Sequence, residues 1–100
     1  MNTFDEVYKV VKKVPRGKVT TYGTIAKAIG INNPRVVGYA LHANKSPETI
    51  PCHRVVNSKG ELAKGYAFGG LGIQKQLLTA EGISFEGNHV DLNKYLYNFR

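Results

Sequence analysis

Apolar residues in the first half of the chain recur at the spacing of amphipathic helices. The first such stripe consists of Phe4, Val7, Val10, Val11 and Val14. Thr3 precedes it and Glu6 follows three residues later, which is the pattern of a capping box with Thr3 as N-cap. Pro15 and Gly17 come next, and both residue types end helices. The pattern predicts a first helix that stops before Pro15.

A second, shorter helix is predicted directly afterwards. Thr20 or Thr21 is the expected N-cap, and Gly30 suits the position just after the last turn. Its apolar positions are Tyr22, Ile25, Ala26 and Ile29. A short extended link precedes this helix, and a turn at residues 31–33 follows it.

A third helix is predicted to run from Pro34 to about Asn44. Asn33 is the expected cap, and proline is favoured at the first helical position. Its inner side carries Val37, Ala40 and Leu41. Two short helices joined by a tight turn, after a leading helix, are typical of a helix-turn-helix unit, here over residues 20–44.

The second half of the chain predicts a small wing and one more helix. Residues 50–56 read as extended, residues 57–60 as a turn, and Glu61-Leu62 as the returning strand of a hairpin wing. The helix of about residues 72–81 carries Ile73, Leu77, Leu78 and Ala80 and ends at Gly82. We also expect the aromatic and apolar residues of the tail to pack on the core: Tyr95, Leu96, Tyr97 and Phe99. The expected fold class is α+β, mainly helical: a winged helix-turn-helix-like single domain spanning residues 1–100.

Length and composition fit one soluble domain. The chain has 100 residues, of which 42% are hydrophobic, and no apolar run approaches the ~20 residues of a membrane span. The first residues have neither the basic start nor the apolar stretch of a secretory signal. A single cysteine fits a reducing compartment. We therefore expect a monomer in the cytoplasm, associated with the nucleoid, or in the nucleus if the source is eukaryotic.

The charge of the chain is +7, and its placement is uneven. After Asp5 and Glu6 no acidic residue appears until Glu48. The basic residues between them are Lys9, Lys12, Lys13, Arg16, Lys18, Lys27, Arg35 and Lys45. This asymmetry favours a polyanionic partner, nucleic acid first. A basic surface that serves only solubility is the alternative on charge alone, and a membrane surface is less favoured because no predicted helix pairs a strong apolar face with a row of lysines.

The lone cysteine lies in the string Pro51-Cys52-His53-Arg54-Val55. A thiol is nucleophilic as the thiolate, which neighbouring positive charge and a basic imidazole both favour. The alternative is a purely structural role, in which a buried cysteine acts as a small apolar side chain. A metal site built from Cys52, His53, His42 and His89 matches no common zinc spacing, so we expect no metal and no cofactor.

The string Gly65-Tyr66-Ala67-Phe68-Gly69-Gly70 belongs to a glycine-rich loop that extends to Gly72. It lacks the Lys-Ser/Thr pair of a phosphate-binding P-loop. We expect it instead to let backbone approach a ligand closely.

Together these strings resemble the O6-alkylguanine-DNA alkyltransferases. The resemblance rests on Pro51–Val55, with Arg35-Val36-Val37-Gly38, Asn44 and Glu81-Gly82 at matching distances. It runs from about residue 17 to residue 82, nearly all of that family's C-terminal DNA-binding and catalytic domain. Its separate N-terminal domain has no counterpart in the sequence. The resemblance implies direct repair: an alkyl group moves irreversibly from guanine O6 in double-stranded DNA to the cysteine sulfur, once per molecule.

The resemblance also implies roles for single residues. Cys52 would be the nucleophile, His53 the base acting through a water, and Glu81 the group that orients His53. Tyr22 would donate its hydroxyl proton to the flipped base. Arg35 would fill the stack that the base vacates.

Further residues are implied to hold the DNA and the base. The DNA-binding set is Arg35, Gly38 and Tyr39, on the third helix, which the family docks in the minor groove, and Thr21 and Lys18, which precede the second helix. The pocket set is Pro51, Val55, Tyr66, Ala67 and Phe68. Asn44 would tie the third helix to the active-site segment, and Arg54 would make a bond beneath the site. Tyr39 departs from the small residue usual beside Gly38, and Lys45 from a frequent proline.

Two other readings are open at this level. Stand-alone alkyltransferase-like proteins are similarly short, bind alkylated DNA without repairing it, and signal to excision repair. They usually carry tryptophan in place of the cysteine, so Cys52 favours the enzyme. A winged helix-turn-helix transcription factor would explain the charge and the helices but assigns nothing to Pro51–Arg54 or to Glu81.

Overall fold

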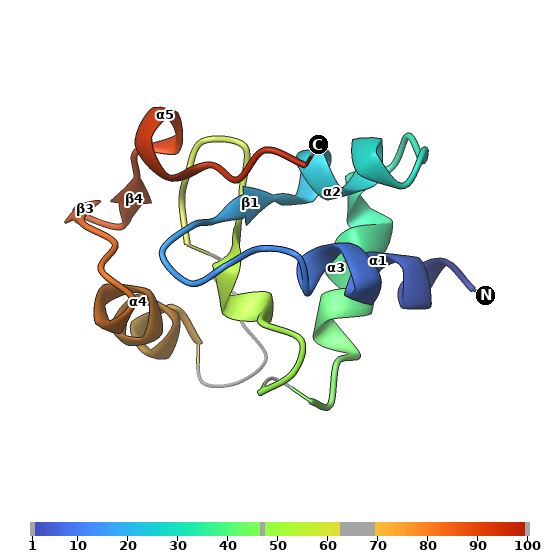
Figure 1. Cartoon of the computed structure of the whole chain (residues 1–100), viewed down its shortest axis with the longest axis horizontal. Helices are drawn as coiled ribbons and strands as arrows, with labels where there is room; N and C mark the ends of the chain where they lie inside the picture. Colours follow the sequence, from blue (N-terminus) through green and yellow to red (C-terminus); the bar gives the residue numbers. More distant parts are fainter. Residues whose placement is uncertain (1, 47, 63–69, 100) are drawn as a thin grey trace.

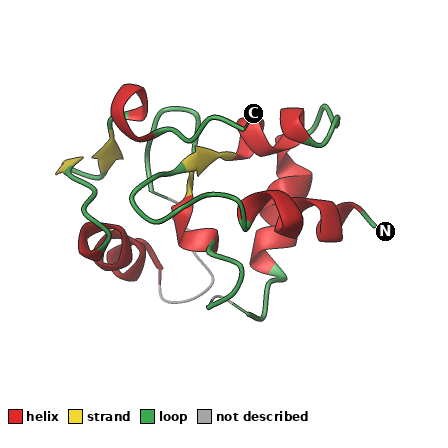
Figure 2. Ribbon diagram, in the orientation of Figure 1, coloured by secondary structure: helices red, strands yellow, loops and turns green. Residues whose placement is uncertain are grey.

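Short helices make up most of the regular structure, and two-residue strands lie between some of them (Figures 1 and 2). The computed structural model describes residues 2–46, 48–62 and 70–99. The helices are α1 (Thr3–Val11), α2 (Tyr22–Ala28), α3 (Pro34–His42), the 3₁₀ turn η1 (Cys52–Arg54), α4 (Gly70–Ala80) and α5 (Leu92–Tyr95). The strands are β1 (Thr20–Thr21), β2 (Val55–Val56), β3 (Phe85–Glu86) and β4 (His89–Val90). The mainly helical α+β class is confirmed.

Helix α1 begins with a different cap from the predicted one. The Asn2 side chain accepts a hydrogen bond from the Asp5 amide at 2.9 Å, and Thr3 is already the first helical residue. The predicted Thr3 cap is therefore wrong by one position, because an extended Asn2 brings its amide oxygen to the free N–H groups of the first turn. The helix ends at Val11, and turns lead on to Pro15.

The two N-caps predicted within the helix-turn-helix are confirmed, at Thr21 and Asn33. The Thr21 hydroxyl accepts from the Thr24 amide at 3.0 Å, and Gly30 after α2 has φ +77°. The Asn33 side chain accepts from the Arg35 amide at 3.0 Å, directly before Pro34. Helix α3 stops at His42, two residues earlier than predicted.

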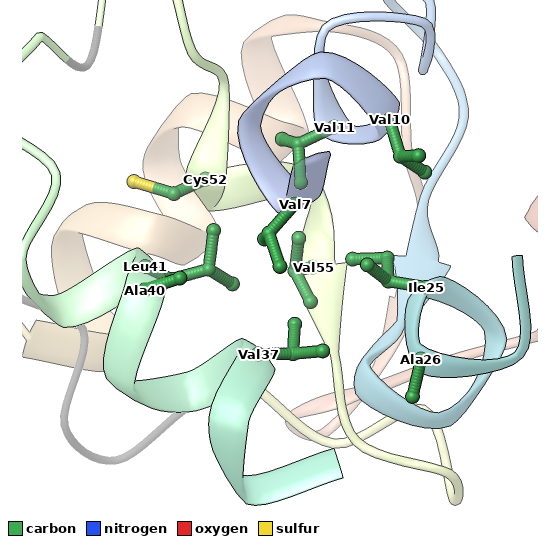
Figure 3. Close-up of a cluster of buried hydrophobic side chains, with 10 residues drawn as sticks. All are labelled: Val7, Val10, Val11, Ile25, Ala26, Val37, Ala40, Leu41, Cys52 and Val55. Atoms are coloured by element: carbon green, nitrogen blue, oxygen red, sulfur yellow. The ribbon is translucent and has the colours of Figure 1, made fainter. Parts of the chain in front are cut away.

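Helices α1, α2 and α3 enclose the first of two apolar clusters (Figure 3). Its members are Val7, Val10, Val11, Ile25, Ala26, Val37, Ala40, Leu41, Cys52 and Val55. All are at most 9% exposed. The inner side predicted for the third helix is confirmed. Cys52 lies at the edge of this cluster, against which the three helices pack.

The turn predicted at residues 57–60 is present, with the Gly60 amide donating to the Asn57 carbonyl at 2.9 Å, but the strand pairing predicted for the hairpin wing is wrong. Strand β2 pairs in parallel with β1, with Thr20 opposite Val55, and Glu61 forms a bridge with His89. Both residues of β2 are buried, so this strand needs cover on both faces, which an exposed wing cannot give. The antiparallel hairpin of the fold is β3–β4, in the tail.

Helix α4 covers the second apolar cluster. That cluster consists of Val19, Val56, Leu62, Leu78, Ile83, Val90 and Tyr95. From residue 72 to the end of α4 the buried residues are Gln74 and Leu78, whereas Ile73 and Leu77 are each 39% exposed. Gly72, expected in the loop, lies inside the helix. The rest of the glycine-rich loop falls outside the described residues.

The tail packs on the core in part. Tyr95 is buried in the second cluster, and Phe99 packs against the first. Tyr97 meets Phe99 edge-on with ring centroids 5.0 Å apart, but Leu96 is 39% exposed, against expectation. In the part of the chain that the structure describes, no helix is long and apolar enough to cross a membrane.

Candidate active site and the α3 face

Cys52 begins the 3₁₀ turn η1, directly after Pro51. Its side chain is 5% exposed, and its sulfur points away from Val11 at the edge of the first cluster (Figure 3). The Cys52 amide donates to the carbonyl of Ile50 at 2.7 Å. The sequence predicted an extended segment here, in which neighbouring side chains point to opposite faces. The structure has a 3₁₀ turn here instead, so the backbone bends at Cys52 and His53.

The next two residues of the turn meet one carboxylate. His53 Nε2 lies 2.8 Å from Glu81 Oε2. Arg54 donates through Nε to Oε1 at 2.9 Å and through Nη2 to Oε2 at 2.7 Å, a bidentate pair. Its remaining Nη1 donates to the carbonyl of Val14 at 2.9 Å. A carboxylate only accepts, so His53 donates from Nε2 and its Nδ1 is the acceptor of the neutral ring.

The surroundings keep Glu81 ionised. Its side chain is 8% exposed, and this burial alone would raise its pKa. The hydrogen bonds from Arg54 and His53, and then their charges, outweigh burial and hold the pKa of Glu81 below its ordinary value. The carboxylate is thus a fixed negative charge behind the imidazole, as the orienting role of Glu81 requires.

Gln74 is a site residue that sequence reasoning missed. Its side chain on α4 is 0% exposed, and Nε2 donates to the carbonyl oxygens of His53 and Val55, each at 3.0 Å. The signal in the sequence was a glutamine one turn before Leu78 in an apolar helix, where a buried polar group needs partners. Nothing in the sequence indicates which carbonyls those partners are.

Asn44 connects the end of α3 to the segment before Cys52. Its Nδ2 donates to the Ile50 carbonyl at 3.1 Å, and its Oδ1 accepts from the Ser46 amide at 2.9 Å. The residue is 5% exposed. These bonds fit the hinge that the sequence predicted at this position.

Two tyrosines lie within electrostatic reach of Cys52. Burial raises the pKa of Tyr22, at the start of α2, and Cys52 raises it further. Burial also raises the pKa of Tyr8, with smaller contributions from Asp5 and Cys52, and the Tyr8 hydroxyl donates to the Ala40 carbonyl at 2.6 Å. Both phenols stay protonated at neutral pH. Tyr8 was not singled out in the sequence, and it fastens α1 to α3.

The outer face of α3 is open. Arg35, Gly38, Tyr39, His42 and Ala43 line a shallow hollow of about 710 Å³. Tyr39 is 61% exposed. The α3 face, as we call these five residues, contains one arginine, one histidine, one tyrosine and no acid.

The structure also describes four other residues of the predicted site: Lys18, Thr21, Pro51 and Val55. The Thr21 hydroxyl is used in the cap of α2, and Lys18 donates to the Lys94 carbonyl at 3.3 Å. Pro51 and Val55 are buried. Tyr66, Ala67 and Phe68 lie outside the described residues. Within residues 2–46, 48–62 and 70–99, no group of three or more His, Cys, Asp or Glu side chains is arranged to hold a metal ion.

A buried thiol whose next residue in the chain is a carboxylate-bound histidine, together with two capped helices whose outer face carries Arg35 and no acid, defines a class: a helix-turn-helix domain with a candidate nucleophilic cysteine. Comparison with known proteins narrows this class. The family described as 6-O-methylguanine DNA methyltransferase, DNA binding domain, matches residues 2–83. The chain belongs to this family.

Relatives differ in length and in name. A bifunctional methyltransferase/endonuclease of Picrophilus torridus is 36% identical over 98% of this chain, and a methylated-DNA–protein-cysteine methyltransferase of Methanothermobacter thermautotrophicus is 46% identical over 81% of it. The matches span 33% and 44% of those two proteins, so the chain corresponds to less than half of each.

The alkyltransferase-like protein 1 of Schizosaccharomyces pombe is similar over nearly its whole length. The two sequences are 39% identical over 95% of this chain and 87% of that protein. Its crystal structure with damaged DNA containing O6-carboxymethylguanine superposes with a TM-score of 0.85 at 32% identity. That match covers 98% of this chain and 99% of the other. The tail after residue 83 therefore has a structural counterpart there.

Proposed function

We propose that this chain repairs DNA directly, by moving an alkyl group from O6 of alkylated guanine to the sulfur of Cys52. The observation that carries the proposal is the Cys52 turn, in which the next residue, His53, is held by Glu81 at 2.8 Å. In the reaction a sulfur–carbon bond forms and the carbon–oxygen bond to O6 breaks. The thioether is stable, so each molecule acts once and needs no cofactor.

The proton bookkeeping follows from the hydrogen bonds of the turn. With Nε2 engaged by Glu81, Nδ1 of His53 is the nitrogen that can take the thiol proton, through a water molecule. Glu81 then stabilises the imidazolium that forms. Tyr22, which its raised pKa keeps protonated before the reaction, supplies a proton to the departing guanine. Afterwards the His53 imidazolium releases its proton to water and the Tyr22 phenolate regains one from water, so no net charge is left on the two side chains. Arg54 and Asn44 are proposed as supports of the turn.

Duplex DNA containing O6-alkylguanine is the proposed partner. Its phosphates would meet the basic half of the chain, including Lys18, and the backbone near Thr21. The α3 face would meet the groove, with Arg35 entering the stack where the base has flipped out. Pro51, Val55 and the loop that contains Tyr66, Ala67 and Phe68 would enclose the flipped base.

A second candidate function is lesion binding without transfer, with a signal to excision repair. The near-complete structural match with the S. pombe alkyltransferase-like protein favours it. Cys52 favours transfer, because lesion binding alone needs no nucleophile at this position.

Stoichiometry separates the two. The protein is titrated with a duplex that carries one O6-methylguanine, and the repaired DNA and the methylated Cys52 peptide are both quantified. We expect both to plateau at one per protein molecule, and we expect Cys52→Ala to bind the duplex but repair none. Continued turnover beyond one equivalent, or tight binding with no methylated peptide, would reject the transfer proposal.

A further inference from the structure

The Gln74 side chain donates hydrogen bonds to the backbone of the segment that contains the Cys52 turn. Its single Nε2 group donates to two carbonyl oxygens, those of His53 and Val55, which flank Arg54 in the chain. The side chain is completely buried. An apolar residue of the same size would leave two buried carbonyls without these donors, which proteins avoid.

Helix α4 and the turn at its end therefore hold the Cys52 turn at two points. Gln74 lies on α4, and Glu81 follows directly after Ala80, its last residue. The two are seven residues apart, about two helical turns, which places them on the same side. Glu81 binds the His53 ring at 2.8 Å, and Gln74 binds the His53 carbonyl at 3.0 Å. The ring and the backbone of His53 are thus bound by two residues of one continuous segment, α4 and the residue that follows it.

We infer that Gln74 is a positioning residue for alkyl transfer, which keeps the His53 imidazole and the Cys52 sulfur in the geometry that the reaction needs. The inference rests on the proposed function. It assigns Gln74 to the chemical step and not to DNA binding, because both of these hydrogen bonds end on the active-site segment. Small displacements of reacting groups cost rate steeply, while the α3 face does not depend on this amide.

The test replaces Gln74 with methionine, which has a similar length but no donor. Gln76, exposed on the same helix, provides the control variant Gln76→Met. Single-turnover rates are measured on a duplex with O6-methylguanine and on the free base O6-methylguanine. For Gln74→Met we expect a loss of roughly tenfold or more on both substrates, with duplex affinity and the Gln76→Met rates within about twofold of wild type. A loss on the duplex alone, or no loss in a folded variant, would overturn the inference.

A second readout does not depend on methyl transfer. The side-chain N–H of His53, bonded to Glu81, is followed by NMR, and the Cys52 thiol is titrated with iodoacetamide across pH. We expect Gln74→Met to speed exchange of that proton with water and to change the pH profile of alkylation, and Gln76→Met to change neither. If the wild type never accepts methyl, the proposed function fails, but these readouts still decide on Gln74: unchanged exchange and an unchanged profile would overturn its role.

Gln74→Lys covers the case in which the methionine variant does not fold. An ammonium group has three donor protons and can serve both carbonyls. We expect this variant to fold and to keep the transfer rate and the His53 signal within about threefold of wild type. A folded Gln74→Lys that transfers tenfold more slowly on both substrates would show that donation to the two carbonyls is not what the reaction requires.

Discussion

The Glu81 network and the α3 face are built in opposite ways. In the network, His53 and Arg54 converge on one carboxylate, and the three side chains are 8–16% exposed. On the α3 face, Arg35 and Tyr39 stand on one helix, and Tyr39 is 61% exposed. Hydrogen bonds between residues far apart in the sequence hold the network together. On the α3 face, helical spacing alone brings the residues to one side of the helix, and that side is open to solvent. A preorganised interior suits chemistry, and an open face with an arginine and no acid suits a large anionic partner.

Glu81→Gln should give the largest effect of the changes that leave the thiol in place. The amide is isosteric but neutral, so it cannot stabilise the imidazolium. We expect transfer at saturating duplex to slow on the order of 10²-fold, while duplex affinity stays within about threefold. The measurement is a single-turnover rate beside a binding titration. Glu86→Gln, on the exposed residue of β3, is the control and should behave as wild type. Equal losses of rate and affinity would show that the Glu81 network does not act on the chemical step separately from DNA binding.

Glu81 also makes a signed prediction for stability against pH. Its pKa is lower in the folded state than its ordinary value of 4.5, so the folded state binds its proton more weakly. Its stabilising contribution is present above that ordinary value and is lost as the pH falls through the folded pKa. Urea unfolding over an acidic pH series should show this loss in the wild type and a flatter acid limb in Glu81→Gln. Parallel curves for the two proteins would contradict the assignment.

Arg35→Ala should change the duplex reaction alone. If Arg35 fills the gap that the flipped base leaves in the stack, its side chain offsets part of the free-energy cost of base flipping. Arg35→Ala removes that compensation, so repair of duplex DNA should slow about tenfold. Repair of the free base should be unchanged, in contrast to the effect expected for Gln74→Met. Similar losses on both substrates would remove Arg35 from the flipping step.

The sequence predicted local features better than long-range ones. The caps at Thr21 and Asn33 were found because the groups they bond lie two or three residues away. The wing was misplaced because the partner of β2 is β1, 35 residues earlier in the register. Glu81 was singled out only through the family resemblance, and Gln74 not at all, since no local pattern encodes a bond from α4 to η1.

Replacing either of two adjacent threonines with valine should change the free energy of unfolding, in opposite directions for the two positions. Thr20 is completely buried, and among the described residues its hydroxyl has no hydrogen-bond partner. Thr20→Val keeps the shape and removes this group, so the free energy of unfolding should rise by about 1 kcal/mol. Thr21→Val removes the cap of α2 and should lower it by about 1 kcal/mol. Urea unfolding measures both, and a destabilised Thr20→Val would mean that its hydroxyl is satisfied after all.

Single lysines of the basic half should give the smallest effects. Lys13 is exposed, and Lys13→Ala should weaken damaged and undamaged duplex alike, by a few-fold. The slope of log affinity against log salt should fall by roughly 0.9 if one phosphate contact is lost. Lys59→Ala, an exposed lysine outside the basic half, is the matched control. A strong preference for one undamaged palindrome that survives high salt would favour the transcription-factor reading instead.

The most direct test of the central claim is the intact mass of the protein after incubation with a duplex containing O6-methylguanine. The account predicts that the wild type gains the mass of one methyl group in place of the thiol hydrogen, and no more, however long the incubation. Cys52→Ala should gain nothing while still retaining the duplex. A wild type that retains the methylated duplex tightly and never gains mass would contradict alkyl transfer and leave lesion binding as the function.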